Sequence, residues 1–129
     1  MTSQTGRCLC GAIRYKVTGP IGLQGHCHCE TCRRATSSPI TTFFVALKDD
    51  VTFEGIEPTL YRSSPDVKRT FCPKCGTPIS YEHATYPDEI HLYATSLDDP
   101  SRISPERHDF WNERVDWLTV TDELDKHEG

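Results

Sequence analysis

The sequence has no hydrophobic run long enough to span a membrane and no excess of positive charge. Residues Met1 to Gly6 contain no apolar segment of the kind that forms a signal peptide, and no later run approaches about 18 apolar residues. These absences predict a cytoplasmic protein with no membrane partner. The 14 lysines and arginines are outnumbered by 19 aspartates and glutamates, which gives a formal net charge of -5. Nucleic acid is therefore not an expected partner.

Internal repeats and low-complexity segments are also absent, and the length favours one folding unit. A chain of 129 residues is long enough to bury a core of its own without disulfides. We expect a single zinc-binding domain over residues 1–129, with its core from about residue 5 to residue 120. Residues 123–129 are expected to form a polar tail.

The seven cysteines are the most informative feature of the sequence. An odd number does not fit a disulfide framework, and the spacings Cys-x-Cys and Cys-x2-Cys are typical of metal ligands. The cysteines divide into a group of four, at positions 8, 10, 72 and 75, and a group of three, at positions 27, 29 and 32. Two metal sites are therefore expected.

The group of three lies in the stretch His26-Cys27-His28-Cys29-Glu30-Thr31-Cys32. On a strand, Cys27 and Cys29 point to the same face, and a tight turn after them brings Cys32 to the same metal. Three protein ligands leave a zinc ion with an open position for water or substrate, as in catalytic sites. We therefore predict a catalytic zinc on Cys27, Cys29 and Cys32.

Two arginines follow this group directly. In one interpretation, Arg33 and Arg34 lie beside the open zinc position and bind a carboxylate of the substrate. In the other, they are solvated charges at the end of a short helix, favoured there by the helix dipole. The sequence allows both.

The group of four is predicted to hold a structural metal. Cys8 and Cys10 alone are compatible with two buried core cysteines, but the knuckle Cys72-Pro73-Lys74-Cys75-Gly76 supplies a second pair. A thioredoxin-like redox pair requires a βαβ context, which the sequence lacks. A metal shared by the two pairs ties the first strand to the middle of the chain and contributes to folding.

Apolar and polar residues alternate in short runs between these cysteines, which predicts a mainly β protein. Four histidines, His83, His91, His108 and His127, are expected to be packed or exposed rather than to bind metal. The strands are expected at 13–17, from 23 into the three-cysteine group, and at 40–47, 51–53, 60–61, 67–71, 78–81 and 90–94, with one helical turn at 30–35.

Taken in order, these motifs resemble the glutathione-dependent formaldehyde-activating enzymes and the wider centromere protein V group. The matching elements are Cys8-x-Cys10-Gly11, Cys27-His28-Cys29-x2-Cys32-Arg33, Phe71-Cys72-Pro73-x-Cys75-Gly76-Thr77, Leu97-Asp98, His108 and Trp117. The resemblance implies a β-tent fold of short antiparallel strands related to zinc ribbons. It also implies two zinc ions per chain, a structural one on Cys8, Cys10, Cys72 and Cys75 and a second on Cys27, Cys29 and Cys32.

The activity implied by the resemblance is carbon–sulfur lyase chemistry, which interconverts formaldehyde plus glutathione and S-hydroxymethylglutathione. In that case zinc binds the substrate sulfur as a thiolate or polarises the hydroxymethyl oxygen, and Arg33 and Arg34 orient carboxylates. The alternatives are a non-catalytic zinc-stabilised binding module, a lyase for a different thiol adduct, and a thiol sensor. The chain departs from the family at Ser37, where many members have glycine, and at Glu123-Leu124-Asp125.

Overall fold

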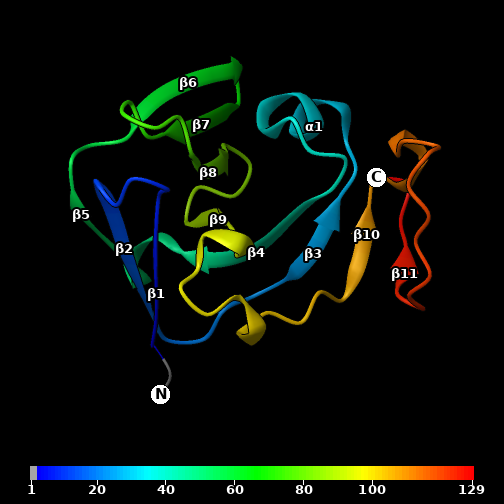
Figure 1. The fold of residues 1–129 in the computed structure, drawn as a ribbon, viewed down its shortest axis with the longest axis horizontal. Helices are drawn as coiled ribbons and strands as arrows, with labels where there is room; N and C mark the ends of the chain where they lie inside the picture. Colours follow the sequence, from blue (N-terminus) through cyan, green and yellow to red (C-terminus); the bar gives the residue numbers. More distant parts are fainter. Residues whose placement is uncertain (1–2) are drawn as a thin grey trace.

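The computed structural model describes residues 3–129 and confirms a mainly β protein (Figure 1). Within these residues one α-helix, α1, spans Glu30–Thr36, and short 3-10 turns span Lys48–Asp50, Ala94–Ser96, Pro100–Arg102 and Trp111–Glu113. The strands are β1 Ser3–Arg7, β2 Ile13–Thr18, β3 Gln24–Cys27, β4 Thr41–Leu47, β5 Val51–Gly55, β6 Thr59–Ser64, β7 Val67–Phe71, β8 Pro78–His83, β9 Glu89–Tyr93, β10 Arg107–Asp109 and β11 Asp125–Lys126.

The strands form two sheets that enclose the main core. The smaller sheet has the order β1-β2-β5, and the larger has the order β11-β10-β3-β4-β9-β8-β7-β6 (Figure 1). In β2 the predicted alternation is confirmed, because Ile13, Tyr15 and Val17 are buried while Arg14 and Lys16 are exposed. Tyr15 and Val17 pack against Phe44 and Leu92 of the larger sheet. One face of the larger sheet is therefore covered by the smaller sheet.

The other face of the larger sheet carries the cysteine group at positions 27, 29 and 32. Along β4, Phe44 lies in the main core, whereas Phe43 and Val45 point the opposite way and pack in a cluster with Cys27. This alternation confirms that β4 is covered on both faces. Strand register then extends the second face across the sheet, since Arg69 lies opposite Tyr81 and Tyr81 lies opposite His91.

Three strands were not predicted, and two of them depart from the antiparallel pattern. β1 pairs with β2 in the usual antiparallel way, but β10 runs parallel to both β3 and β11. The tail predicted at 123–129 therefore contains a short strand. β10 and β11 have only three and two residues, too few for a period-2 pattern to be visible in the sequence. Over residues 3–129, no helix is long and apolar enough to cross a membrane.

Candidate metal centres and active site

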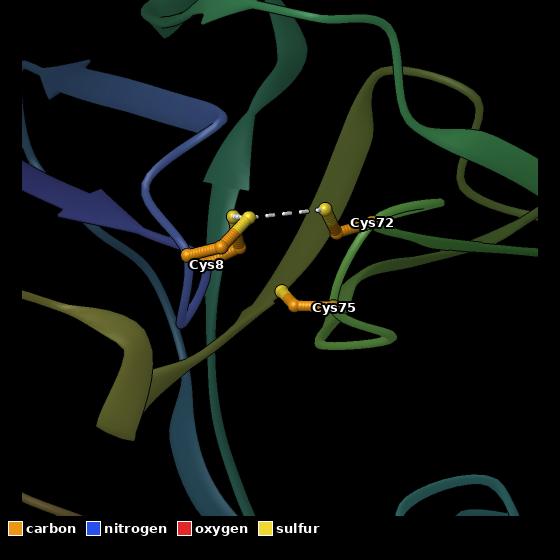
Figure 2. Close-up of side chains that lie close together, drawn as sticks. Cys8, Cys72 and Cys75 are labelled. Atoms are coloured by element: carbon orange, nitrogen blue, oxygen red, sulfur yellow. Dashed lines mark hydrogen bonds between the residues drawn. The ribbon is translucent and has the colours of Figure 1, made fainter.

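The predicted group of four cysteines is assembled by two loops (Figure 2). Cys8 and Cys10 follow β1, while Cys72 and Cys75 lie between β7 and β8, and Figure 2 shows Cys8 facing the latter pair. The Cys10 sulfur lies 3.6 Å from that of Cys8 and 3.8 Å from that of Cys72. Tetrahedral zinc with bonds of about 2.3 Å places its sulfurs about 3.8 Å apart. All four thiols are free, and their spacing fits a tetrahedral metal.

The local sequence explains why these loops direct their sulfurs inward. The backbone N–H of Ile13 donates to Cys8 Sγ at 3.3 Å, and that of Lys74 donates to Cys72 Sγ at 3.4 Å. Gly76 has φ +80, and its N–H donates to the Cys72 carbonyl at 2.8 Å, which closes the predicted knuckle. Hydrogen bonds from Thr77 lower the pKa of Cys75 to about 5, so this thiol is readily ionised for metal binding.

The group of three lies where β3 passes into α1. Cys27 is the last residue of β3, Cys29 caps the helix, and Cys32 lies in its first turn. Their sulfurs lie within 4.8 Å of one another, without a fourth His, Asp or Glu ligand in the group over residues 3–129. The predicted group is therefore assembled, but Cys29 reaches it as a helix cap rather than from a strand. The C-terminal cap of the helix is Ser37, the residue that replaces glycine, and it has a left-handed φ of 56.

Hydrogen bonds favour the ionised form of Cys29. Its sulfur accepts from the Cys32 backbone N–H at 3.4 Å and lies 3.3 Å from the Thr31 hydroxyl. Hydrogen bonds from Cys27 and Cys32, with a further one from Thr31, lower the pKa of Cys29 to about 2. A thiolate in this position is a ready metal ligand or nucleophile.

These three cysteines open into a cavity of about 320 Å³. Its walls combine aromatic rings with a few polar groups, the composition typical of small-molecule sites. Besides the cysteines, the lining residues are Thr31, Thr41, Phe43, Arg69, Tyr81, His91, Tyr93, Asp109, Phe110 and Glu113. Burial lowers the pKa of His91 to about 4, so this ring is neutral near pH 7.

None of the lining residues other than the three cysteines was predicted from the sequence as a site residue, and Arg69 is the cation among them. It is 7% exposed, and its Nη2 donates to Cys32 Sγ at 3.7 Å and to Thr31 Oγ1 at 3.4 Å. Burial opposes its charge, but the neighbouring Cys32 outweighs burial and raises the pKa of Arg69. The sequence does contain a signal, because Arg69 alternates in phase with Val67 and Phe71 and so lies on the inward face of β7.

Comparison with known proteins identifies the family of this chain. Residues 3–113 match the family described as glutathione-dependent formaldehyde-activating enzyme. The chain belongs to this family. The resemblance stated from the cysteine motifs is thereby confirmed, and the formaldehyde-activating family match includes all seven cysteines.

Two curated relatives and one crystal structure extend this result. An uncharacterized lyase of Schizosaccharomyces pombe is 37% identical over 83 residues, which span 64% of this chain and 60% of that protein. A protein of Halomonas elongata, named for glutathione-dependent formaldehyde activation, is 27% identical over 124 residues, which span 89% of this chain and 79% of that protein. A crystal structure from Rhodobacter sphaeroides shares the fold, with a TM-score of 0.60 and 24% identity over 76% of this chain and 93% of that one.

Arg33 and Arg34 do not line the cavity of this family member. Arg34 pairs with Glu30 at 2.9 Å, and its side chain is 77% exposed. Arg33 Nε donates to the carbonyl of His28 at 3.4 Å. Both arginines lie in the last turn of α1, where the helix dipole favours positive charge. Their contact with a substrate carboxylate therefore stays a prediction.

Two buried histidines and an aspartate form a hydrogen-bonded row next to the loop that carries Cys27 and Cys29. His28 Nε2 lies 2.8 Å from His108 Nδ1, and His108 Nε2 lies 3.0 Å from the Asp122 carboxylate. His28 and His108 are each 1% exposed. His108 is thus a packed residue, as predicted, that connects β10 to the loop between the cysteines.

Proposed function

We propose that this protein is a zinc-dependent carbon–sulfur lyase that interconverts formaldehyde plus glutathione and S-hydroxymethylglutathione. Membership of the formaldehyde-activating family supports this activity, as does the lyase name of the S. pombe relative. The observation that carries the proposal is the group of three cysteines, without a fourth ligand in the described chain, at the wall of a cavity. A structural site would be closed by four.

The two cysteine groups have the donor chemistry that zinc prefers. Cys8, Cys10, Cys72 and Cys75 would hold a structural zinc that ties the loops of the two sheets together. The second zinc would be held by Cys27, Cys29 and Cys32. When bound there, zinc supplies a Lewis acid with one open position, which favours the thiolate form of a thiol ligand.

The residues around the second group suit a small polar thiol. Aromatic rings line much of the cavity, and Arg69 supplies a positive charge next to Cys32. The carboxylates of Asp109 and Glu113 line the same cavity, and Glu113 Oε1 is held by the backbone N–H of Glu30 at 2.9 Å. Glutathione carries an ammonium group, and the carboxylates of Asp109 and Glu113 supply the opposite charge for it.

The test is the rate at which the protein exchanges free formaldehyde with its glutathione adduct. Exchange spectroscopy by NMR measures this rate at equilibrium, with the spontaneous rate in buffer as the baseline. We expect the zinc-loaded protein to exceed the baseline and Cys29→Ser to abolish the gain. Ser37→Gly, at the far end of the same helix, is the matched control and should retain the full rate.

Two other results would redirect the proposal. Glutathione binding without faster exchange would favour a binding module or a lyase for another thiol adduct. A fully active Cys29→Ser variant would exclude the group of three as the reacting site. Neither result can come from misfolding, because one requires glutathione binding and the other requires full activity.

A further inference from the structure

Arg69 is a buried cation without a carboxylate partner in residues 3–129. Its guanidinium meets the Tyr93 hydroxyl at 3.4 Å, the Thr31 hydroxyl at 3.4 Å and the Cys32 sulfur at 3.7 Å. Its Nε is buried and has no hydrogen-bond partner among the described residues. A buried charge is costly unless an opposite charge compensates it. The Cys32 sulfur compensates part of this charge, and the unpartnered Nε–H leaves Arg69 able to stabilise a further anion that arises inside the cavity.

The strand framework holds this guanidinium in place before any ligand binds. Arg69 lies at the centre of β7, directly opposite Tyr81 of β8, and its guanidinium carbon lies 5.0 Å from the centroid of the Tyr81 ring. Tyr93 lies on the next strand, β9, and accepts from Nη1. Donors that are fixed in advance stabilise developing charge without further reorganisation.

The position of Arg69 selects which part of a ligand it reaches. Its guanidinium contacts Cys32, one of the three sulfurs that define the reacting site. In a hydroxymethyl thioether the oxygen is only two bonds from sulfur, whereas the carboxylates of glutathione are many bonds away. A ligand whose sulfur lies at the three cysteines therefore presents its hydroxymethyl oxygen, not its carboxylates, to Arg69.

We propose that Arg69 and Tyr93 form an oxyanion site for the hydroxymethyl oxygen of a thiol–aldehyde adduct, an inference that rests on the proposed function. In adduct formation the thiolate sulfur attacks the formaldehyde carbon, a C–S bond forms, and the C=O π electrons move to oxygen. The resulting alkoxide takes up a proton from solvent, which replaces the one released when the thiol ionised. In the reverse direction the hydroxyl loses its proton, the C=O bond re-forms and the C–S bond breaks.

Each residue has a defined part in this site. Arg69 donates N–H hydrogen bonds to the oxygen and supplies its counter-charge while remaining protonated throughout. The Tyr93 hydroxyl accepts from Arg69, which leaves its own proton free to donate to the same oxygen. Burial raises the pKa of Tyr93 to about 12, so this hydroxyl remains a donor at neutral pH.

The experiment separates the effect on rate from the effect on binding. Exchange spectroscopy gives the maximal rate, and titration calorimetry gives the glutathione Kd, for zinc-loaded wild type and Arg69→Gln. The matched control is Arg62→Gln, an exposed arginine on the neighbouring strand β6. We expect Arg69→Gln to lower the maximal rate by about 100-fold or more, the scale of losing an oxyanion donor, with the Kd changed less than about threefold. Arg62→Gln should leave both unchanged.

Four outcomes bear on the proposal. An undiminished rate in Arg69→Gln, beside an active wild type, overturns the oxyanion site alone. An unchanged maximal rate with a Kd weakened tenfold also overturns it, because Arg69 would then bind a remote carboxylate of glutathione and not an oxygen near the sulfur. A wild type that fails to accelerate exchange refutes the proposed function, and this inference falls with it. The predicted rate loss with an unchanged Kd and full zinc content supports the proposal.

If Arg69→Gln loses zinc or fails to fold, the affinities of two small thiols for the wild-type protein test the oxyanion site instead. Mercaptoacetate and 2-mercaptoethanol are small thiols of the same length, and only mercaptoacetate carries an anionic oxygen near its sulfur. Charge-assisted hydrogen bonds from Arg69 should make mercaptoacetate bind at least about tenfold more tightly to the zinc-loaded protein. Equal affinities would overturn the proposal.

Discussion

The strongest prediction about stability concerns the group of four cysteines. The double variant Cys10→Ser/Cys75→Ser removes one ligand from each loop, so a zinc ion no longer joins the loops firmly. Cys10 is exposed and Cys75 half-buried, whereas the two ligands that remain, Cys8 and Cys72, are buried in the core at 1% and 0% exposure. The double variant therefore tests the metal cross-link with little disturbance of core packing.

The separation of the two loops sets the size of the effect. Cys10 and Cys72 lie 62 residues apart, and a cross-link that closes a loop of this length is worth about 4 kcal/mol of unfolded-chain entropy. For a chain of 129 residues, this loss corresponds to a fall in Tm of roughly 15 °C. The five-residue spacing of Cys27 and Cys32 limits the same contribution from the group of three to about 2 kcal/mol.

Scanning calorimetry of the zinc-loaded proteins measures this difference, with zinc content determined on the same samples. We expect Cys10→Ser/Cys75→Ser to lower Tm by about twice as much as Cys32→Ser, or more. Chelation of the wild type should reproduce the larger fall. Equal losses of Tm in the two variants would refute the assignment of the group of four as the structural staple.

Two further substitutions test local features. Ser37→Gly removes a left-handed φ of 56 from a residue with a side chain, so it should raise the free energy of unfolding by about 1 kcal/mol; a lower urea midpoint would contradict this. The folded pKa of His91, about 4, lies below its unfolded value of 6.5, so the unfolded chain binds more protons and stability falls as pH drops from 6.5 to 4. His91→Gln should lack this pH-dependent loss of unfolding free energy, which is about 3 kcal/mol at pH 4. Urea unfolding between pH 6.5 and pH 4 measures the loss. The same pH dependence in His91→Gln and wild type would show that His91 does not cause it.

Most of the correct predictions rest on patterns between residues close together in sequence. Alternation predicted β2 and β7, and the spacing of the cysteines predicted which of them group together. Ile13, Tyr15 and Val17 are buried because adjacent side chains on a strand point to opposite faces, a rule that needs no information about distant residues. The cysteine groups were similarly visible, since most of each motif lies within a few residues.

The cavity depends instead on how distant strands pair. Arg69, Tyr81 and His91 come together only because β7, β8 and β9 pair in one register, which no local pattern specifies. The sequence placed Arg69 on an inward face but did not show what that face encloses. For the same reason the prediction of substrate contacts, which stays untested, covered the nearest arginines in sequence, Arg33 and Arg34, and did not include Arg69, which lines the cavity.

The most direct test of the central claim is a count of the sulfur atoms around zinc, measured by X-ray absorption at the zinc edge before and after addition of glutathione. Groups of four and three cysteines predict an average of 3.5 sulfurs per zinc, from (4 + 3)/2, with oxygen or nitrogen completing the second site. Binding of the glutathione sulfur at the open position raises this average to 4. An average of 4 before glutathione is added, or one that stays at 3.5 when glutathione is saturating, would contradict a substrate site on Cys27, Cys29 and Cys32.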